Sequence, residues 1–167
     1  MFQTIVRFAF AAALAAGVSQ SAFADTHFTP VLTISGDVAS TSDDTVLSMD
    51  MDMLRQLPAT TFETSTIWTD GVHIFTGVSL MDLMAELGVE DGVLVATAIN
   101  DYAVEIPVSD AVENGPIIAY LMDGEEMTVR DKGPLWVIYP YDSNADYRSE
   151  VVYSRSIWQL DRLEIVQ

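Results

Sequence analysis

The stretch that most constrains the fold is residues 130–140, with the sequence RDKGPLWVIYP. Its Gly133-Pro134 pair predicts a rigid corner, and the apolar run over residues 135–139 predicts a buried strand directly after it. Arg130 and Lys132 put two positive charges on the turn before this strand, and Lys132 is the only lysine in the chain. Because such a turn offers cationic hydrogen-bond donors, we expect an anion to bind there.

Residues 1–24 have the pattern of a secretory signal peptide. Arg7 precedes an apolar run over residues 8–18, and Ala22-Phe23-Ala24 fits the small-x-small cleavage pattern. The apolar run is too short to span a bilayer. We therefore predict cleavage after Ala24, a periplasmic or secreted product, and no membrane insertion after cleavage. An uncleaved membrane anchor is the alternative.

The remaining residues, 25–167, have the length of one domain. The chain contains no cysteine, which excludes thiolate catalysis, zinc–thiolate sites and iron–sulfur clusters. Its two histidines, His27 and His73, have no neighbour at metal-ligand spacing. The sequence therefore predicts no metal site.

The charge is strongly negative and unevenly distributed. The formal net charge is −18, and five of the seven basic residues lie in residues 130–167. A field of this sign repels nucleic acid and anionic membranes, so neither is expected as a partner. Two explanations remain, a solvated acidic surface or a cationic protein partner, and a salt titration of binding would separate them.

Short apolar and β-branched runs separated by turn residues predict a strand-rich domain. Two short helices are expected, one capped by Ser48 or Asp50 and stopped by Pro58, the other capped by Ser79 and stopped by Gly88. Thr76-Gly77 is interpreted as a turn. The predicted class is a β-rich α+β fold with mixed sheets and two short helices. The predicted strands cover residues 31–36, 60–67, 72–75, 92–99, 102–106, 116–122, 126–129, 135–139 and 157–166.

Polar turns at one end of a sheet often form a common rim, and three turns of this chain could converge in that way. Aromatic side chains near these turns could wall a planar ligand, while the cations could bind an oxyanion. In the alternative interpretation Arg130 and Lys132 only neutralise nearby acids, and Trp136 and Trp158 belong to the core. The candidate ligand-binding residues are Trp68, Asn100, Asp101, Tyr102, Arg130 and Lys132, with Trp136 and Tyr139 as further possible walls.

The order of several motifs resembles the molybdopterin-binding oxidoreductase domain of the sulfite oxidase type, especially its small exported members. The resemblance covers almost the whole of residues 25–167. It is carried by LTISG (32–36), residues 54–58, Trp68, FTGVSL (75–80) with Leu83, NDYAVEIP (100–107), MDG (122–124), RDKGPLWVIYP (130–140) and residues 158–165.

The resemblance implies a β-rich mixed fold around a molybdopterin cofactor, with oxygen-atom transfer at the metal as the family's chemistry. It places the family's metal-binding cysteine near Thr64 or Ser65, where this chain has hydroxyl side chains. It also places a lysine before the closing tryptophan, where this chain has Ile157 before Trp158.

Three hypotheses follow from these departures. In the first, the chain keeps the scaffold without the metal thiolate and binds a small anionic or planar ligand, or a protein partner. In the second, it is an active oxidoreductase whose metal is bound without cysteine, through Thr64 or Ser65. In the third, it is an acidic interaction module with no ligand.

Overall fold

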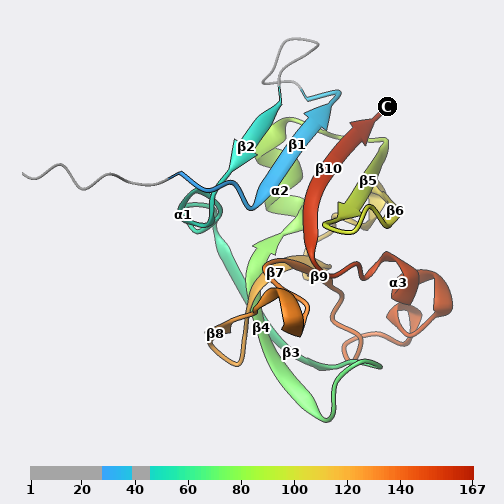
Figure 1. Cartoon of the computed structure of the whole chain (residues 1–167). Helices are drawn as coiled ribbons and strands as arrows, with labels where there is room; N and C mark the ends of the chain where they lie inside the picture. The colour runs from blue at the N-terminus through green and yellow to red at the C-terminus, as the bar shows by residue number, and fades with distance from the viewer. Residues whose placement is uncertain (1–27, 39–45) are drawn as a thin grey trace, which may run out of the picture.

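The computed structural model describes residues 28–38 and 46–167 (Figure 1). The predicted signal peptide and cleavage site, together with His27, lie outside these residues. In the described part of the chain, no helix is both long enough and apolar enough to cross a membrane.

The beginning and the end of the described chain lie side by side in one sheet. Strand β1 (Leu32–Gly36) pairs in parallel with β10 (Leu160–Val166), and all other pairs in this sheet are antiparallel. The strand order is β2-β1-β10-β5-β6. The other three strands are β2 (Leu47–Met49), β5 (Val93–Ala98) and β6 (Ala103–Pro107).

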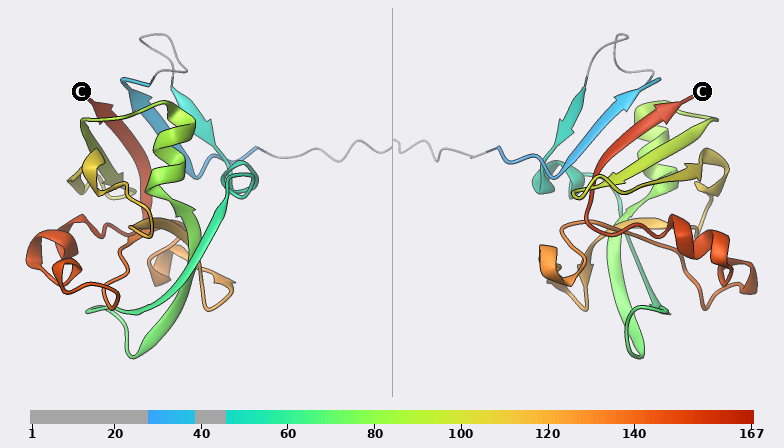
Figure 2. Two further views of the ribbon diagram at one scale, coloured as in Figure 1. Left: turned by 180° about the vertical axis from the view of Figure 1, so that it is seen from behind. Right: turned by 45° about the vertical axis from the view of Figure 1, so that its right-hand side comes forward.

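One face of this sheet is covered by helix α2 (Leu80–Leu87), as the views from front and back show (Figures 1 and 2). Ser79 Oγ accepts a 2.9 Å hydrogen bond from Asp82 N, and Gly88 ends the helix in the left-handed conformation. Both predicted caps are thus confirmed. The apolar stripe of the helix, Leu80, Leu83, Met84 and Leu87, is buried in the core.

The second sheet has the order β3-β4-β7-β8, and β9 pairs with β7 off this path. It extends below the first sheet in Figure 1 as a long hairpin of β3 and β4. Its strands are β3 (Ala59–Ser65), β4 (Val72–Ser79), β7 (Ile117–Met122), β8 (Glu125–Glu126) and β9 (Trp136–Ile138).

The interpretation of Thr76-Gly77 as a turn is wrong, because β4 runs straight through both residues. A Cβ atom on Gly77 would lie 2.0 Å from the carbonyl oxygen of Ile118 on the neighbouring strand. The glycine therefore serves the close approach of β4 to β7, at a point where the pairing register shifts.

The stretch over residues 130–140 joins the two sheets. Trp136–Ile138 is fully buried, as predicted for this strand. A Cβ atom on Gly133 would lie 1.8 Å from the Met127 carbonyl oxygen, so the corner admits only glycine. Lys132 O and Leu135 O accept hydrogen bonds from the chain just before β10, Lys132 O from Gln159 N and Leu135 O from Leu160 N, both 3.0 Å long.

Two further short helices complete the α+β fold, and its β-rich class is confirmed. Asp50 caps the first of them by accepting from Met53 N at 2.8 Å. The predicted strand over 126–129 ends at Glu126, and a 3₁₀ turn follows over Val129–Asp131. These helices are α1 (Met51–Leu54) and α3 (Glu150–Arg155), with 3₁₀ turns at Val108–Asp110 (η1), Val129–Asp131 (η2) and Ala145–Tyr147 (η3).

Candidate ligand-binding site

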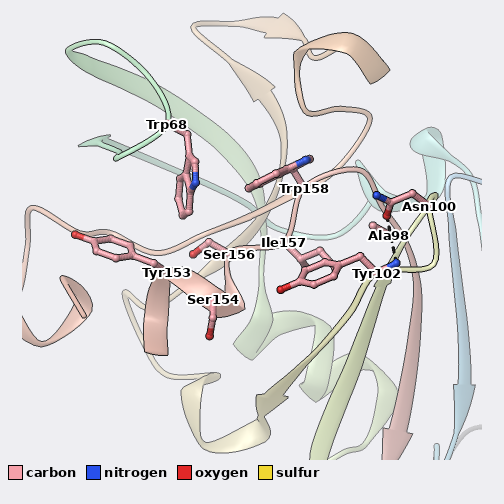
Figure 3. A pocket seen from close by; sticks show the side chains of 9 residues that line it. All are labelled: Trp68, Ala98, Asn100, Tyr102, Tyr153, Ser154, Ser156, Ile157 and Trp158. Carbon is pink, nitrogen blue, oxygen red and sulfur yellow. Dashed lines mark hydrogen bonds between the residues drawn. The ribbon is translucent and has the colours of Figure 1, made fainter. Parts of the chain in front are cut away.

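A pocket of about 340 Å³ opens where the loop after β3, the β5–β6 turn and the α3–β10 segment meet (Figure 3). Six of its nine lining residues are apolar or aromatic and three are polar. None carries a formal charge. The lining consists of Trp68, Ala98, Asn100, Tyr102, Tyr153, Ser154, Ser156, Ile157 and Trp158.

Aromatic rings form most of the wall. The ring of Trp68 packs edge-on against Tyr153, with centroids 5.9 Å apart and an interplanar angle of 85°. It packs in the same manner against Trp158, at 5.8 Å and 67°. Tyr102 and Trp158 stand at the mouth, with 57% and 39% of their surface exposed. Because the rings meet at steep angles, they present differently oriented faces around one space (Figure 3).

A local turn fixes the position of Trp68. Thr66 Oγ1 accepts hydrogen bonds from Trp68 N at 3.1 Å and from Thr69 N at 3.0 Å. This hydroxyl-capped turn is a known alternative to regular secondary structure for threonine. It holds the indole ring toward α3 rather than toward solvent.

The inner wall of the pocket is built around Ser156. Trp136 Nε1 donates to Ser156 O at 3.1 Å, and Ser156 Oγ donates to Val152 O at 3.0 Å. Since the serine proton is used in this way, the Tyr141 hydroxyl must donate to Ser156 Oγ. Burial raises the pKa of Tyr141 to about 12, so it is a neutral donor at physiological pH.

Two of the polar side chains of the lining are partly engaged in local hydrogen bonds. Asn100 Oδ1 accepts from Tyr102 N at 3.2 Å, and Ser154 Oγ donates to Val151 O at 2.7 Å. The Asn100 NH₂ group donates no hydrogen bond to any residue in the described part of the chain. The pocket therefore offers ring faces together with a small number of polar atoms.

The structure brings together half of the ligand-binding residues that the sequence predicts. Trp68, Asn100 and Tyr102 line the pocket. Asp101 instead forms an ion pair with Arg162 at 2.6 Å, on the outer face of the first sheet.

The two predicted cations both lie outside the pocket lining. The Lys132 ammonium lies 5.6 Å from the ring centroids of Trp136 and Trp158, and it does not line the pocket. Arg130 is exposed in the 3₁₀ turn η2 and is also outside the lining. The Arg130–Lys132 turn and the aromatic pocket are thus neighbouring features rather than one site.

Three aromatic residues differ from one or the other interpretation of the sequence. Trp136 and Tyr139, considered as walls, are buried in the core, and Tyr139 donates to Asp110 Oδ2 at 2.7 Å. Trp158, considered as a core residue, is at the pocket mouth. Sequence reasoning also missed Tyr153, Ser154 and Ser156, because no local pattern shows that α3 packs against a loop some 85 residues earlier in the chain.

Thr64 and Ser65 are both bound to the loop after β9. Thr64 is fully buried, and its hydroxyl accepts from Asp142 N at 3.1 Å and donates to Ser65 O at 3.2 Å. Ser65 donates twice to the Asp142 carboxylate, from N at 2.6 Å and from Oγ at 2.9 Å. These bonds, led by the main-chain one, lower the pKa of Asp142 below its usual 3.8. We call this group of three residues the Asp142 latch.

Comparison with protein families matches residues 29–145 to the family described as "Oxidoreductase molybdopterin binding domain". The match covers well over half of the chain. The chain belongs to this family.

A solved structure with the same fold is the sulfane dehydrogenase SoxCD from Paracoccus pantotrophus. It shares 20% sequence identity with this chain and superposes with a TM-score of 0.58. The likeness covers 80% of this chain but only 37% of that protein's chain. At this identity it shows the fold alone. A search of curated proteins found no match.

The range that matches the family, residues 29–145, includes only some of the residues that line the pocket. Trp68, Asn100 and Tyr102 lie within residues 29–145, and so does the Asp142 latch. The α3 segment that supplies Tyr153 and Trp158 lies beyond the matched range. Within residues 28–38 and 46–167, no group of three or more histidine, aspartate or glutamate side chains is arranged to hold a metal ion.

Proposed function

We propose that this protein is an exported member of the molybdopterin-binding family that binds a small ligand in its aromatic pocket and does not bind molybdenum through a protein side chain. The observation that carries the first half of this proposal is the pocket itself. Concave, largely apolar sites with a few polar groups are where proteins bind small molecules. Four aromatic rings around about 340 Å³ suit a small ligand that contacts ring faces, either a one- or two-ring planar compound or a compact cation.

The Asp142 latch supports the second half. Thr64 and Ser65 occupy the positions where the family resemblance puts the metal thiolate, and the chain has no cysteine. The Thr64 hydroxyl already bonds Ser65 O and Asp142 N, and the Ser65 hydroxyl donates to the Asp142 carboxylate. A buried threonine hydroxyl that accepts one hydrogen bond and donates its proton in another does not fit the role of an anionic metal ligand. We therefore derive no chemistry through a molybdenum centre.

Metal analysis tests this part directly. Protein purified from a host that makes the molybdenum cofactor should contain far less than one molybdenum atom per chain. Stoichiometric molybdenum, lost in Thr64→Ala, would instead support the alternative of an active oxidoreductase with hydroxyl ligation.

Ligand binding is tested by the fluorescence of the tryptophans, two of which line the pocket. Pterin should quench this fluorescence saturably, whereas the binding of indole, which itself fluoresces, is measured by titration calorimetry. Tyr102→Leu removes an exposed ring of the mouth while retaining every tryptophan, and it should weaken the quenching. Phe28→Leu removes an exposed ring outside the lining and should leave it unchanged. Equal responses of both variants would reject the pocket as the binding site.

Other expectations from the sequence remain proposals of the same kind. A periplasmic or secreted location follows from the signal peptide pattern. A cationic protein partner follows from the net charge of −18. An anionic ligand at the Arg130–Lys132 turn would have to bind outside the aromatic pocket, because neither cation lines it.

A further inference from the structure

We infer that the aromatic pocket selects small quaternary ammonium compounds, those with a trimethylammonium group such as choline or glycine betaine. This inference rests on the proposed function, because it names the ligand class of the same pocket. The sequence led us to expect a planar or anionic ligand. The ligand inferred here is instead a compact group that carries a positive charge.

The arrangement of the rings is the first argument. Trp68, Tyr102, Tyr153 and Trp158 surround one opening (Figure 3). The edge-on contacts of Trp68 with Tyr153 and Trp158 leave ring faces standing at 85° and 67° to one another. A flat ligand can stack on one face at a time, whereas a roughly spherical cation contacts several faces at once. Boxes of this kind are how proteins recognise quaternary ammonium groups.

The second argument is the small number of hydrogen-bond acceptors in the pocket lining. A primary ammonium carries three N–H donors that need acceptors, and the lining has no carboxylate to provide them. Asn100 Oδ1 already accepts one hydrogen bond from Tyr102 N, and Ser156 Oγ is enclosed between Tyr141 and Val152. A trimethylammonium group has no N–H and needs no hydrogen-bond acceptor. It therefore loses little on entering this site.

Charge is the third argument. The whole chain carries a formal net charge of −18, which raises the local concentration of cations and repels anions. No lining residue carries a positive charge that would oppose this attraction. Long-range attraction thus brings cations to the protein, and the ring faces hold those that do not require hydrogen bonds.

The protein already places one ammonium near a ring of the pocket. Lys132 Nζ lies 5.6 Å from the ring centroids of both Trp136 and Trp158. Trp158 also lines the pocket, so the same indole would face the bound cation and the lysine. Because two positive charges near one ring repel each other, Lys132 weakens cation binding. It would strengthen the binding of an anion, and this difference in sign separates the two ligand classes.

The decisive experiment compares choline with 3,3-dimethylbutan-1-ol, its uncharged isostere, by titration calorimetry at low salt. Choline should bind about five- to thirty-fold more tightly, which is the range that a cation–π contribution supplies. Trp158→Leu and Tyr102→Leu should each weaken choline binding, and Phe28→Leu should not. Both removed rings are at the exposed mouth, so these variants should fold, and thermal unfolding verifies that they do.

Lys132→Met tests whether the pocket prefers a cation or an anion. It should tighten choline binding several-fold, and a weaker affinity for choline would overturn the inference. Equal affinities for choline and its neutral isostere would also overturn it. If pterin or indole binds but choline does not, the ligand class is wrong while the proposed binding function stands. If none of these compounds binds, both proposals fail.

Discussion

His73 Nδ1 donates a 2.7 Å hydrogen bond to Asp123 Oδ2, and His73 Nε2 lies 2.9 Å from the carbonyl oxygen of Asp70. Both partners are acceptors, so only the doubly protonated imidazolium can donate to both. Asp123 Oδ1 also accepts from Ile74 N at 2.9 Å. This cluster ties the tip of the β3–β4 hairpin to the β7–β8 turn.

The His73–Asp123 pair should make stability depend on pH in two opposite ways. The hydrogen bond to Asp123 raises the pKa of His73 above its usual 6.5. The stability that protonated His73 contributes is therefore complete below pH 6.5 and is lost as the pH rises through the raised pKa. The same bond lowers the pKa of Asp123 below 3.8, so its share is complete above pH 3.8 and is lost as the pH falls through the lowered value.

Urea unfolding of the wild type and His73→Gln over a series of pH values measures this effect. The difference in the free energy of unfolding should be largest between pH 3.8 and 6.5, where both groups are charged. Asp123→Asn should show the same profile, because it removes the other half of the pair. A difference that stays constant over the whole range would contradict the role of His73.

Gly77 and Gly71 should respond very differently to alanine. At Gly77 the new Cβ would meet Ile118 O at 2.0 Å and Ala119 Cα at 2.6 Å, and main-chain atoms within a sheet cannot move aside cheaply. We expect Gly77→Ala to cost more than about 4 kcal/mol of unfolding free energy. Gly71 has open space but a φ of +80°, so Gly71→Ala should cost only about 1–2 kcal/mol. Similar losses in urea unfolding would reject the close-approach explanation.

The sequence predicts those features of the fold that depend on neighbouring residues. Ser79 and Gly88 delimit α2 because capping is decided within one helical turn. The buried strand after Gly133-Pro134 was likewise evident from its apolar run. Gly77 does not belong to a turn, because the reason for that glycine is a strand some 40 residues later in the chain.

The site was less predictable than the fold for the same physical reason. Trp68, Asn100 and Tyr102 were found because they sit in recognisable polar turns. Tyr153 and Trp158 were not, because exposure of an aromatic side chain is decided by which elements pack around it. Lys132 was expected to bind an anion, but its position over two indole rings follows from packing that the spacing of charges does not reveal.

The ion pair of Arg155 with Asp110 should support the pocket through α3. Arg155 Nη1 donates to Asp110 Oδ2 at 2.8 Å, and the same oxygen accepts from the Tyr139 hydroxyl. Both charged side chains are largely buried. Arg155→Met leaves Asp110 with one donor, and it should cost about 1–3 kcal/mol of stability.

Because α3 carries Tyr153 and Ser154, the same substitution should also weaken ligand binding in the fluorescence titration. Arg55→Met removes an exposed arginine that pairs with exposed Glu126, away from the pocket lining, and serves as the matched control. Its effect on stability should be within about 1 kcal/mol of zero. If the two arginine variants lose equal stability and affinity, α3 is not held by Asp110.

The Asp142 latch should contribute to stability but not to ligand affinity. Asp142→Ala removes the acceptor of two hydrogen bonds from Ser65, and because water can replace this exposed carboxylate, the cost should be about 1 kcal/mol. Asp142→Asn retains one acceptor oxygen and should lose less. The pKa of Asp142 is lowered, so its contribution should be complete above pH 3.8 and disappear as the pH falls below this value.

Urea unfolding at neutral and acidic pH measures the stability of these variants, and the fluorescence titration measures their affinity for ligand. Affinity unchanged at neutral pH would mean that the position corresponding to the family's thiolate now serves only to fasten β3 to the loop after β9. A large loss of affinity without loss of stability would place Thr64 and Ser65 in the ligand site, contrary to the arrangement of their hydrogen bonds.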